Sequence, residues 1–342
     1  MGTVQPGDMI RWAREAIGVG DSATDWRIVP TEHAQLLATG APSLAQDLRG
    51  ERPQGLAEIY EQCNSQANRD RDLFKSTLSK ANGAVFFTAV FSALLLLLAG
   101  LQGSLGPVGP WAAKVIGPLG LLSAGLATMW LSQVRDRSLS KRWAESRAKA
   151  EAKRLAYFKA VMEAARQDGQ AQLLALEYTR RFLLDNQIDY FHQRGQQHQR
   201  AADRAINVSA QAVFVASSFT ALAGLLVMWD PRLAVLAGLG VIASAYAAFV
   251  ASRSAVNQDR ENAERYRAAE DQLRERKLDL DVYRQRAAAG DLRAVQEFFA
   301  PIFLTLEADH KGFLSDSEKR EFAIGNMEQR LDAARESLSS AH

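Results

Sequence analysis

Aromatic, histidine and arginine side chains gather on both sides of Gly195, where they could bind a phosphorylated ligand. Arginine forks pair with phosphate oxygens, and aromatic rings stack on nucleobases. The candidate ligand-binding residues are Arg180, Arg181, Tyr190, Phe191, His192, Arg194, His198, Arg200 and Arg204. The same basic residues would also suit anionic lipid headgroups, which is the more ordinary role of arginine beside a membrane.

Catalytic chemistry is not indicated by the sequence. Its five histidines lack the spacing of a metal site, and neither an HExxH nor a CxxC motif occurs. The stretch Gly238-Leu-Gly-Val-Ile-Ala243 matches a dinucleotide-binding fingerprint, but it lies inside an apolar run where the strand-turn-helix context of that fingerprint is missing. We therefore predict that the protein is not an enzyme and uses no cofactor and no metal.

The elements around these residues include four long apolar runs, at 81–113, 115–134, 205–229 and 233–252, and each run is free of charge. A helix needs about 20 apolar residues to cross a bilayer, so each run is long enough. A membrane enzyme would keep ionisable groups inside such runs, and these hold no Asp, Glu, Lys, Arg or His. Allowing for a turn at Gln102–Pro110, we predict spans at about 84–101, 111–132, 207–229 and 233–252.

The two pairs of runs share a pattern that indicates an internal repeat. The stretch from Phe86 to Leu94 aligns with that from Phe214 to Leu222. In the second run of each pair, small residues recur at every fourth position: Gly120, Ala124, Thr128 and Ser132, then Gly240, Ser244, Ala248 and Ser252. Such a row lies along one helix face and permits close helix packing in lipid. In an oligomer the rows could also line a weakly polar pore.

Basic residues mark one end of every run, whereas the two turns predicted to lie outside the cell contain only Lys114 and Arg232. By the positive-inside rule both termini and the middle segment face the cytoplasm. No cleavable signal peptide is visible, and a single cysteine, Cys63, fits a reducing compartment. We predict a multi-pass protein of the cell inner membrane with both termini cytoplasmic.

Outside the runs, helical spacing and the placement of glycine and proline predict long cytoplasmic helices. A helix should begin near Leu56 and continue into the first span. The other predicted helices cover 135–167, 171–191 with a kink at Gly195, 251–289, 292–306 and a last one starting near Ser315. The chain should reverse at Asp168-Gly169, and the end at 337–342 should be disordered. In the first 56 residues we predict a helix at 8–17 and a short strand at 25–29.

The predicted fold is an all-α integral membrane protein with two repeated transmembrane helical hairpins and long cytoplasmic, coiled-coil-like extensions. Its predicted segments are an N-terminal cytoplasmic segment (1–56), two-span modules (57–166 and 171–290) and C-terminal cytoplasmic helices (291–342). Since the four predicted spans of one chain, with their small side chains, do not readily enclose a pore, we expect a homo-oligomer, with a tetramer favoured.

The stretch Tyr178-Thr-Arg-Arg-Phe182, followed by Leu184-Asp-Asn-Gln-Ile-Asp-Tyr-Phe191, resembles the opening of SLATT-type two-span modules. Their pattern is an arginine followed by a D-Q-I-x-Y-[FW]-like stretch, into which this chain inserts Asn186. A looser version runs from Ile59 to Phe74, and the stretches 141–147 and 303–313 are also similar to the family. The resemblance covers residues 57–314 as two tandem modules.

The resemblance implies a membrane effector of prokaryotic conflict systems. Such a protein would form a pore or ion channel gated by a nucleotide or oligonucleotide from a partner nucleotidyltransferase, and would act in antiphage defence by abortive infection. It brings no catalytic residues, and double-stranded DNA is not an expected partner. The main alternative is a non-enzymatic membrane scaffold whose cytoplasmic helical stalk recruits partners.

Overall fold

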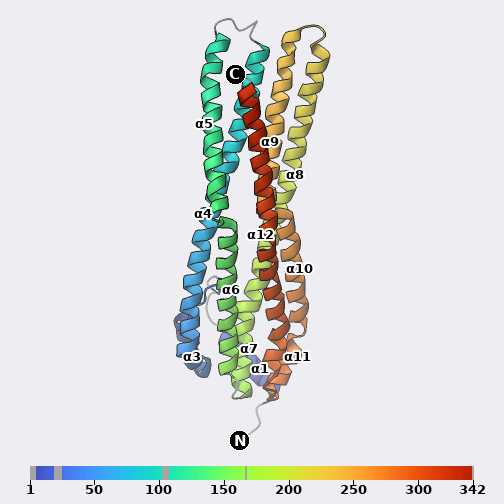
Figure 1. Cartoon of the computed structure of the whole chain (residues 1–342). Helices are drawn as coiled ribbons and strands as arrows, with labels where there is room; N and C mark the ends of the chain where they lie inside the picture. Colours follow the sequence, from blue (N-terminus) through green and yellow to red (C-terminus); the bar gives the residue numbers. More distant parts are fainter. Residues whose placement is uncertain (1–4, 19–24, 102–107, 166–167, 341–342) are drawn as a thin grey trace. The chain divides into compact units, whose positions relative to one another are not determined.

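The computed structural model describes residues 5–18, 25–101, 108–165 and 168–340, and the regular elements in these ranges are all helices (Figure 1). This confirms the all-α class. Three short helices come first, and each begins at a proline: α1 (Pro6–Ile17), α2 (Pro30–Leu37) and α3 (Pro42–Leu48). Proline suits the first helical position because its missing N–H would have no partner there.

The short strand predicted at 25–29 is wrong. Residues 25–27 form a turn and a bend, and 28–29 have no regular structure. Asp25 is buried and accepts hydrogen bonds from Arg181, whereas Trp26 is exposed. An ion pair to Arg181 therefore holds this stretch in place, and no β ladder is involved.

The helix predicted from Leu56 into the first span is confirmed as α4 (Glu51–Gly100). The continuous helix predicted at 135–167 is wrong, because α5 (Val108–Asp136) ends and α6 (Leu139–Ala164) begins around Ser138, whose φ is 46°. Residues 102–107 of the predicted turn lie outside the described residues.

The single helix predicted at 251–289 is divided in the same way. It consists of the end of α9 (Val235–Asn257), then α10 (Asp259–Leu278) and α11 (Leu280–Ala288). Gln258, between α9 and α10, has a φ of 52°. Neither break contains glycine or proline, so the usual sequence signals of a helix end do not predict them.

The predicted reversal near Asp168 is confirmed, since the Asp168 carboxylate caps α7 (Gly169–Thr179) by accepting from the Ala171 N–H at 2.7 Å. A π-helical segment, η2 (Arg180–Asp185), then leads into α8 (Asn186–Leu226). A π turn accommodates one extra residue in a helix, and it lies directly before Asn186, the insertion in the family-like pattern. No kink occurs at Gly195, where α8 stays regular.

The last helix, α12 (Ala294–Ser340), also differs from the prediction. The start expected near Ser315 is wrong, because one helix passes through it. The expected disorder is wrong for 337–340, and residues 341–342 lie outside the described residues. A short 3₁₀ segment, η3 (Pro231–Ala234), completes the elements between α8 and α9.

The chain forms two compact units, each assembled from three separate stretches. Unit 1 comprises Met1–Arg69, Ala144–Gln197 and Asn262–Ser315, and unit 2 comprises Asp70–Trp143, His198–Glu261 and Asp316–His342. The long helices α4, α8 and α12 contribute residues to both. This division concerns packing, and the sequential modules predicted above stay a prediction.

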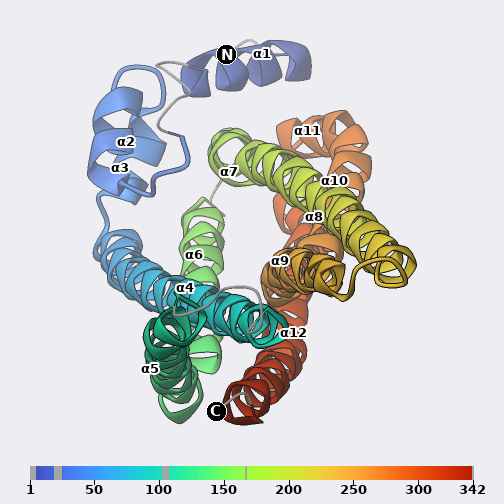
Figure 2. The ribbon, with the colours of Figure 1, turned by 90° about the horizontal axis from the view of Figure 1, so that it is seen from above.

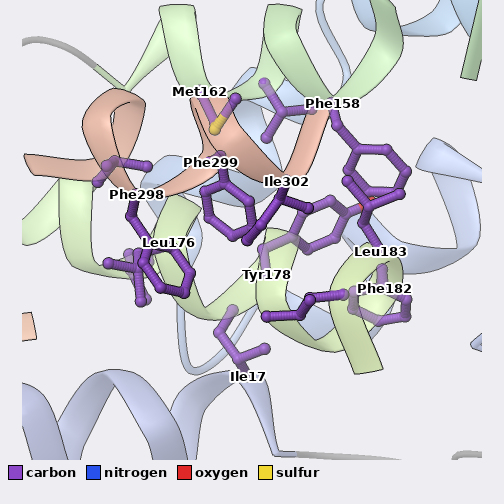
Figure 3. Packing of buried hydrophobic residues seen from close by; sticks show 14 of the residues in the cluster. Ile17, Phe158, Met162, Leu176, Tyr178, Phe182, Leu183, Phe298, Phe299 and Ile302 are labelled. Atoms are coloured by element: carbon purple, nitrogen blue, oxygen red, sulfur yellow. The ribbon is translucent and has the colours of Figure 1, made fainter. Parts of the chain in front are cut away.

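Unit 1 has a core rich in aromatic residues (Figure 3). Tyr178 and Phe158 are almost completely buried, as are Phe298 and Phe299 from α12. Ile17, at the end of α1, packs into the same cluster. The short N-terminal helices therefore belong to the core of this unit and are more than an appendage.

His33 lies in this core and is 7% exposed, so little water is available to stabilise a charge on its ring. Its Nδ1 is 2.7 Å from the Tyr178 hydroxyl, and its ring packs 4.2 Å from that of Phe182. Burial lowers the pKa of His33 to about 4, and this outweighs Asp25, which raises it. Burial likewise lowers the pKa of His310 to about 4 in the same unit.

We predict that unit 1 loses stability as the pH falls from 6.5 towards 4. Both histidines are neutral when folded, whereas the unfolded chain takes up protons below a pKa of 6.5. Stability is therefore complete above that pH and falls by about 1.4 kcal/mol per histidine for each pH unit below it. Chemical denaturation of His33→Gln should show a flatter pH dependence than wild type. The exposed His192→Gln is the control, and equal pH slopes in all three proteins would contradict the prediction.

Four helical stretches are long and apolar enough to cross a membrane: Glu51–Gly100, Gly109–Asp136, Gly169–Leu226 and Val235–Leu278. Gly109–Asp136 contains the predicted span at 111–132, and each of the other three stretches overlaps a predicted span that extends slightly beyond it. Only 11 to 33% of the residues in their most apolar windows are buried, so most of this apolar surface faces outward. A soluble monomer rarely exposes so much apolar surface, whereas lipid would cover it. The fold therefore fits a membrane protein.

In unit 2, α4 lies beside α5 and α8 beside α9, as Figure 2 shows from above. The Ser123 hydroxyl donates to the Ala84 carbonyl at 2.9 Å, and the Ser209 hydroxyl donates to that of Ala247 at 3.3 Å. These bonds satisfy polar groups inside apolar helices, where water is not available to do so.

Candidate functional site

The first two predicted ligand-binding residues already have protein partners. Arg181 is buried and makes a bidentate pair with Asp25, at 2.6 and 2.8 Å, and also donates to the Ile17 carbonyl. Arg180 donates to Glu177 at 2.7 Å and pairs with Asp185. Because the Arg181 guanidinium is buried and donates to protein oxygens, it is not accessible to a phosphate.

The aromatic residues before Gly195 pack against α10. Phe191 is buried, and its ring stacks on Tyr266 with centroids 5.6 Å apart. His192 is exposed and lies 3.0 Å from Glu270, and Arg194 is placed over the Tyr190 ring at 5.7 Å. Of these four predicted residues, His192 and Arg194 remain accessible to a ligand.

The remaining predicted residues, His198, Arg200 and Arg204, belong to unit 2. His198 Nδ1 lies 2.8 Å from the Asp259 carboxylate, next to the second helix break. Arg200 and Arg204 are exposed on α8. Because the nine predicted residues are divided between the two units, the structure does not describe them as one pocket, and their ligand role stays a prediction.

Some residues of the two small-residue rows pack against other helices within unit 2. A Cβ on Gly240 would lie 2.8 Å from the Thr220 hydroxyl and 2.9 Å from the Ala216 carbonyl, so α8 and α9 approach closely there. Ala124 and Ser252 are buried, whereas Thr128 and Ser244 are exposed. Only part of each row is therefore accessible to another chain.

Sequence reasoning missed a cleft of about 440 Å³ in unit 1, between α4 and the stretch before α2. Trp26, which is 67% exposed, and Tyr60 form its aromatic walls. Its polar lining consists of Arg27, Thr31, Gln54, Glu58, Glu61, Asn64 and Asn68. Aromatic rings stack on a planar heterocycle, and carboxamides and carboxylates match the donors at its edge.

The Tyr60 wall of this cleft borders a buried group of charges. Glu151 is 2% exposed and contacts Arg147 at 2.5 Å and Arg154 at 2.6 Å. Burial alone would raise the pKa of Glu151, but the two arginines outweigh it and lower the pKa. Burial raises the pKa of Tyr60, and the charges of Arg154, Glu151 and Arg147 also act on its hydroxyl. A molecule in the cleft would therefore lie near groups whose charges are shielded from water.

The second unexpected feature is Arg320 of α12, which joins the two helix breaks of unit 2. Its side chain is 2% exposed. Nε donates to the Ser140 hydroxyl at 2.9 Å, just after the break at Ser138, and Nη1 donates to the Gln258 side chain at 3.0 Å. The guanidinium also lies over the Trp143 ring at 5.5 Å.

Further contacts hold α12 at the same place. The Gln258 amide donates to the Asp316 carbonyl at 2.9 Å, so Gln258 contacts α12 through both ends of its amide. Beside the first break, Arg142 pairs with buried Asp70 of α4 at 2.8 Å. We call Ser140, Trp143, Gln258, Asp316 and Arg320 the break cluster. Each helix that leaves a span pair is therefore bound to α12 beside the point where it is interrupted.

The fold and these sites define a helical protein with four candidate membrane spans and a buried polar cluster at two helix breaks. No protein-family model matches the chain, and neither a curated protein nor a solved structure matches it. In the described part of the chain, no three His, Cys, Asp or Glu side chains gather so as to hold a metal ion.

Proposed function

We propose that the protein is a membrane effector that assembles into an oligomeric, nucleotide-gated pore or ion channel in the bacterial inner membrane. The observation that supports this best is the break cluster. The helices that continue from two candidate spans are interrupted there, and one arginine of α12 binds beside both breaks. A displacement of α12 would therefore act on both span pairs at once, as a gate requires.

The breaks also support the proposed internal duplication. Ser138 and Gln258 are separated by as many positions as Gly120 and Gly240, the first members of the two small-residue rows. Both residues have positive φ values, 46° and 52°, which residues other than glycine seldom adopt. Two transmembrane hairpins that share one ancestor would carry the same unusual turn at the same position.

Gating needs a ligand that binds the open and closed states differently. The Trp26–Tyr60 cleft suits the base of a nucleotide, while the exposed Arg194, Arg200 and Arg204 remain candidates for its phosphates. Several helices have residues in both units, and among them α12 carries Arg320, so we propose that binding in unit 1 reaches the break cluster through α12.

The SLATT resemblance and the one-sided basic residues support the remaining parts of the proposal. The signal would come from a partner nucleotidyltransferase, and both termini and the middle segment would face the cytoplasm. A homo-oligomer, with a tetramer favoured, would depolarise the membrane during antiphage defence. The scaffold alternative differs in one measurable respect, since it requires no ion flux.

Ion flux through vesicles provides the test. We expect the full-length protein in phosphatidylethanolamine and phosphatidylglycerol vesicles to release K⁺ when cyclic dinucleotides or cyclic oligoadenylates are added as probes. Trp26→Ala should reduce this response several-fold because it removes one stacking surface of the cleft. Trp12→Ala is the matched control, an exposed tryptophan of α1 outside the cleft. Absence of flux with every probe, together with an unchanged membrane potential in expressing cells, would contradict the pore and favour the scaffold.

A further inference from the structure

The second half of α12 lies against the apolar helices of unit 2 although it carries many charges (Figure 1). Three contacts show its course along the spans. Glu328 pairs with Arg135 at the cytoplasmic end of the second predicted span. The Ser92 hydroxyl donates to the Ala334 carbonyl at 2.9 Å, and Leu338 lies 2.8 Å from a Cβ placed on Gly120.

These contacts place the helix at membrane depth. Ser92 is eight residues beyond Ala84, where the first predicted span begins, which corresponds to about 12 Å along a helix. The hydrocarbon core of a bilayer is about 30 Å thick, so Ala334 and its neighbours lie close to its middle. Gly120 likewise lies well inside the second predicted span.

One face of this part of α12 packs on the spans. Ala323, Ile324, Met327 and Leu331 belong to the apolar cluster of unit 2, together with residues of α4 and α5. Leu338 is completely buried. The recurrence at three and four positions is that of a helix with a single apolar face. The opposite face is consequently left without a partner in unit 2.

That opposite face is polar and exposed. We call it the polar strip, and it consists of Gln329, Asp332, Arg335, Glu336 and Ser339. Charged side chains at the middle of a bilayer are costly in lipid, and in membrane proteins they face the interior of a bundle or a water-filled cavity. Among the described residues of one chain, no such cavity lies on this side, because the spans lie on the apolar face of the helix.

We propose that the polar strip lines the water-filled lumen of the assembled pore, with further copies of the same chain around it. The inference rests on the proposed function and names the helix that forms the conduction path. In this arrangement α12 enters the lumen from the cytoplasmic side and separates the spans of its own chain from the water. The C-terminal end of α12 then lies within the lumen, which replaces the cytoplasmic C-terminus expected from the basic residues. Each strip carries two carboxylates and one guanidinium, so the lumen favours cations.

Cysteine accessibility tests the position of the strip. Cys63 is the single cysteine, so a Cys63→Ser protein provides a background in which one cysteine at a time can be introduced. Full-length Asp332→Cys and Glu336→Cys proteins in vesicles should react with a water-soluble cationic methanethiosulfonate, and K⁺ flux should change several-fold on reaction. Leu331→Cys, which faces the spans, is the matched control and should not react.

Ion selectivity tests the role of the strip independently. Arg335→Glu should raise the permeability of K⁺ over Cl⁻ several-fold, and the isosteric Glu336→Gln should lower it. If the wild-type protein conducts but the strip cysteines are unreactive and both variants keep wild-type selectivity, the strip lies outside the conduction path. Quenching of a label at position 336 by brominated acyl chains would also overturn the inference, because it would place the strip in lipid. Absence of conduction in the wild type would instead overturn the proposed function itself.

Discussion

Arg320→Met should destabilise unit 2 and abolish its response to the signal. Methionine fills much of the volume of arginine but donates no hydrogen bond, so the buried Gln258 and Ser140 side chains lose their shared partner. A buried polar group without a partner costs about 1–3 kcal/mol, so two of them should cost about 2–6 kcal/mol. Chemical denaturation in detergent would measure this loss. K⁺ flux in vesicles should no longer depend on the nucleotide probes, because α12 would no longer hold the two breaks together.

Lys319→Met provides the control for this experiment. Lys319 is the preceding residue on α12, but its side chain is 64% exposed. The same replacement there should change the free energy of unfolding by less than about 0.5 kcal/mol. If Arg320→Met were as stable and as responsive as Lys319→Met, the break cluster would have no part in folding or gating.

Arg181→Leu should destabilise unit 1 strongly, whatever ligand the protein binds. It leaves the Asp25 carboxylate buried without its bidentate partner. Removing one member of a buried ion pair costs about 3–5 kcal/mol, because the remaining charge is uncompensated. The loss should be visible as a lower midpoint of chemical denaturation. This outcome would assign Arg181 a structural role in place of the ligand contact predicted from sequence.

Two further variants separate the ion pair from other effects of the replacement. Arg194→Leu removes an exposed arginine of α8 in the same unit and should leave the free energy of unfolding within about 0.5 kcal/mol of wild type. The double variant Asp25→Leu/Arg181→Leu should recover much of the loss, because it leaves no buried charge unpaired. A double variant less stable than Arg181→Leu would show that Asp25 contributes through contacts other than this pair.

The parts of the fold that sequence predicts well are those governed by local pattern. The four apolar runs predict helices because any backbone group in lipid must be satisfied within its own segment. Asp168 predicts a reversal because its side chain caps the next helix locally. The inserted Asn186 is a local signal of the same kind, because an extra residue in a helical pattern is typical of a π turn, and the π-helical segment directly precedes it.

The features that sequence missed depend on partners far along the chain. Asp25 is 156 positions from Arg181, and Gln258 is 62 positions from Arg320. The helix start predicted near Ser315 is wrong because α12 is continuous there. At this point the Asp316 carbonyl accepts a hydrogen bond from Gln258, a residue far away in the sequence. Apolar residues recur at helical spacing from Ala323 to Leu338, and this pattern predicts the amphipathic last helix but does not say that its apolar face packs on the spans.

The conformations of Ser138 and Gln258 have an energetic consequence. A left-handed backbone costs about 1–2 kcal/mol for a residue with a side chain, so the two breaks together hold a small amount of stored strain. The cost disappears if α5 joins α6 and α9 joins α10 in continuous helices, whereas the contacts of Arg320 favour the interrupted form. The strain at the two breaks then opposes the hydrogen bonds of Arg320. These two free energies are close enough in size for a weakly bound signal to shift the equilibrium between the continuous and the interrupted helices.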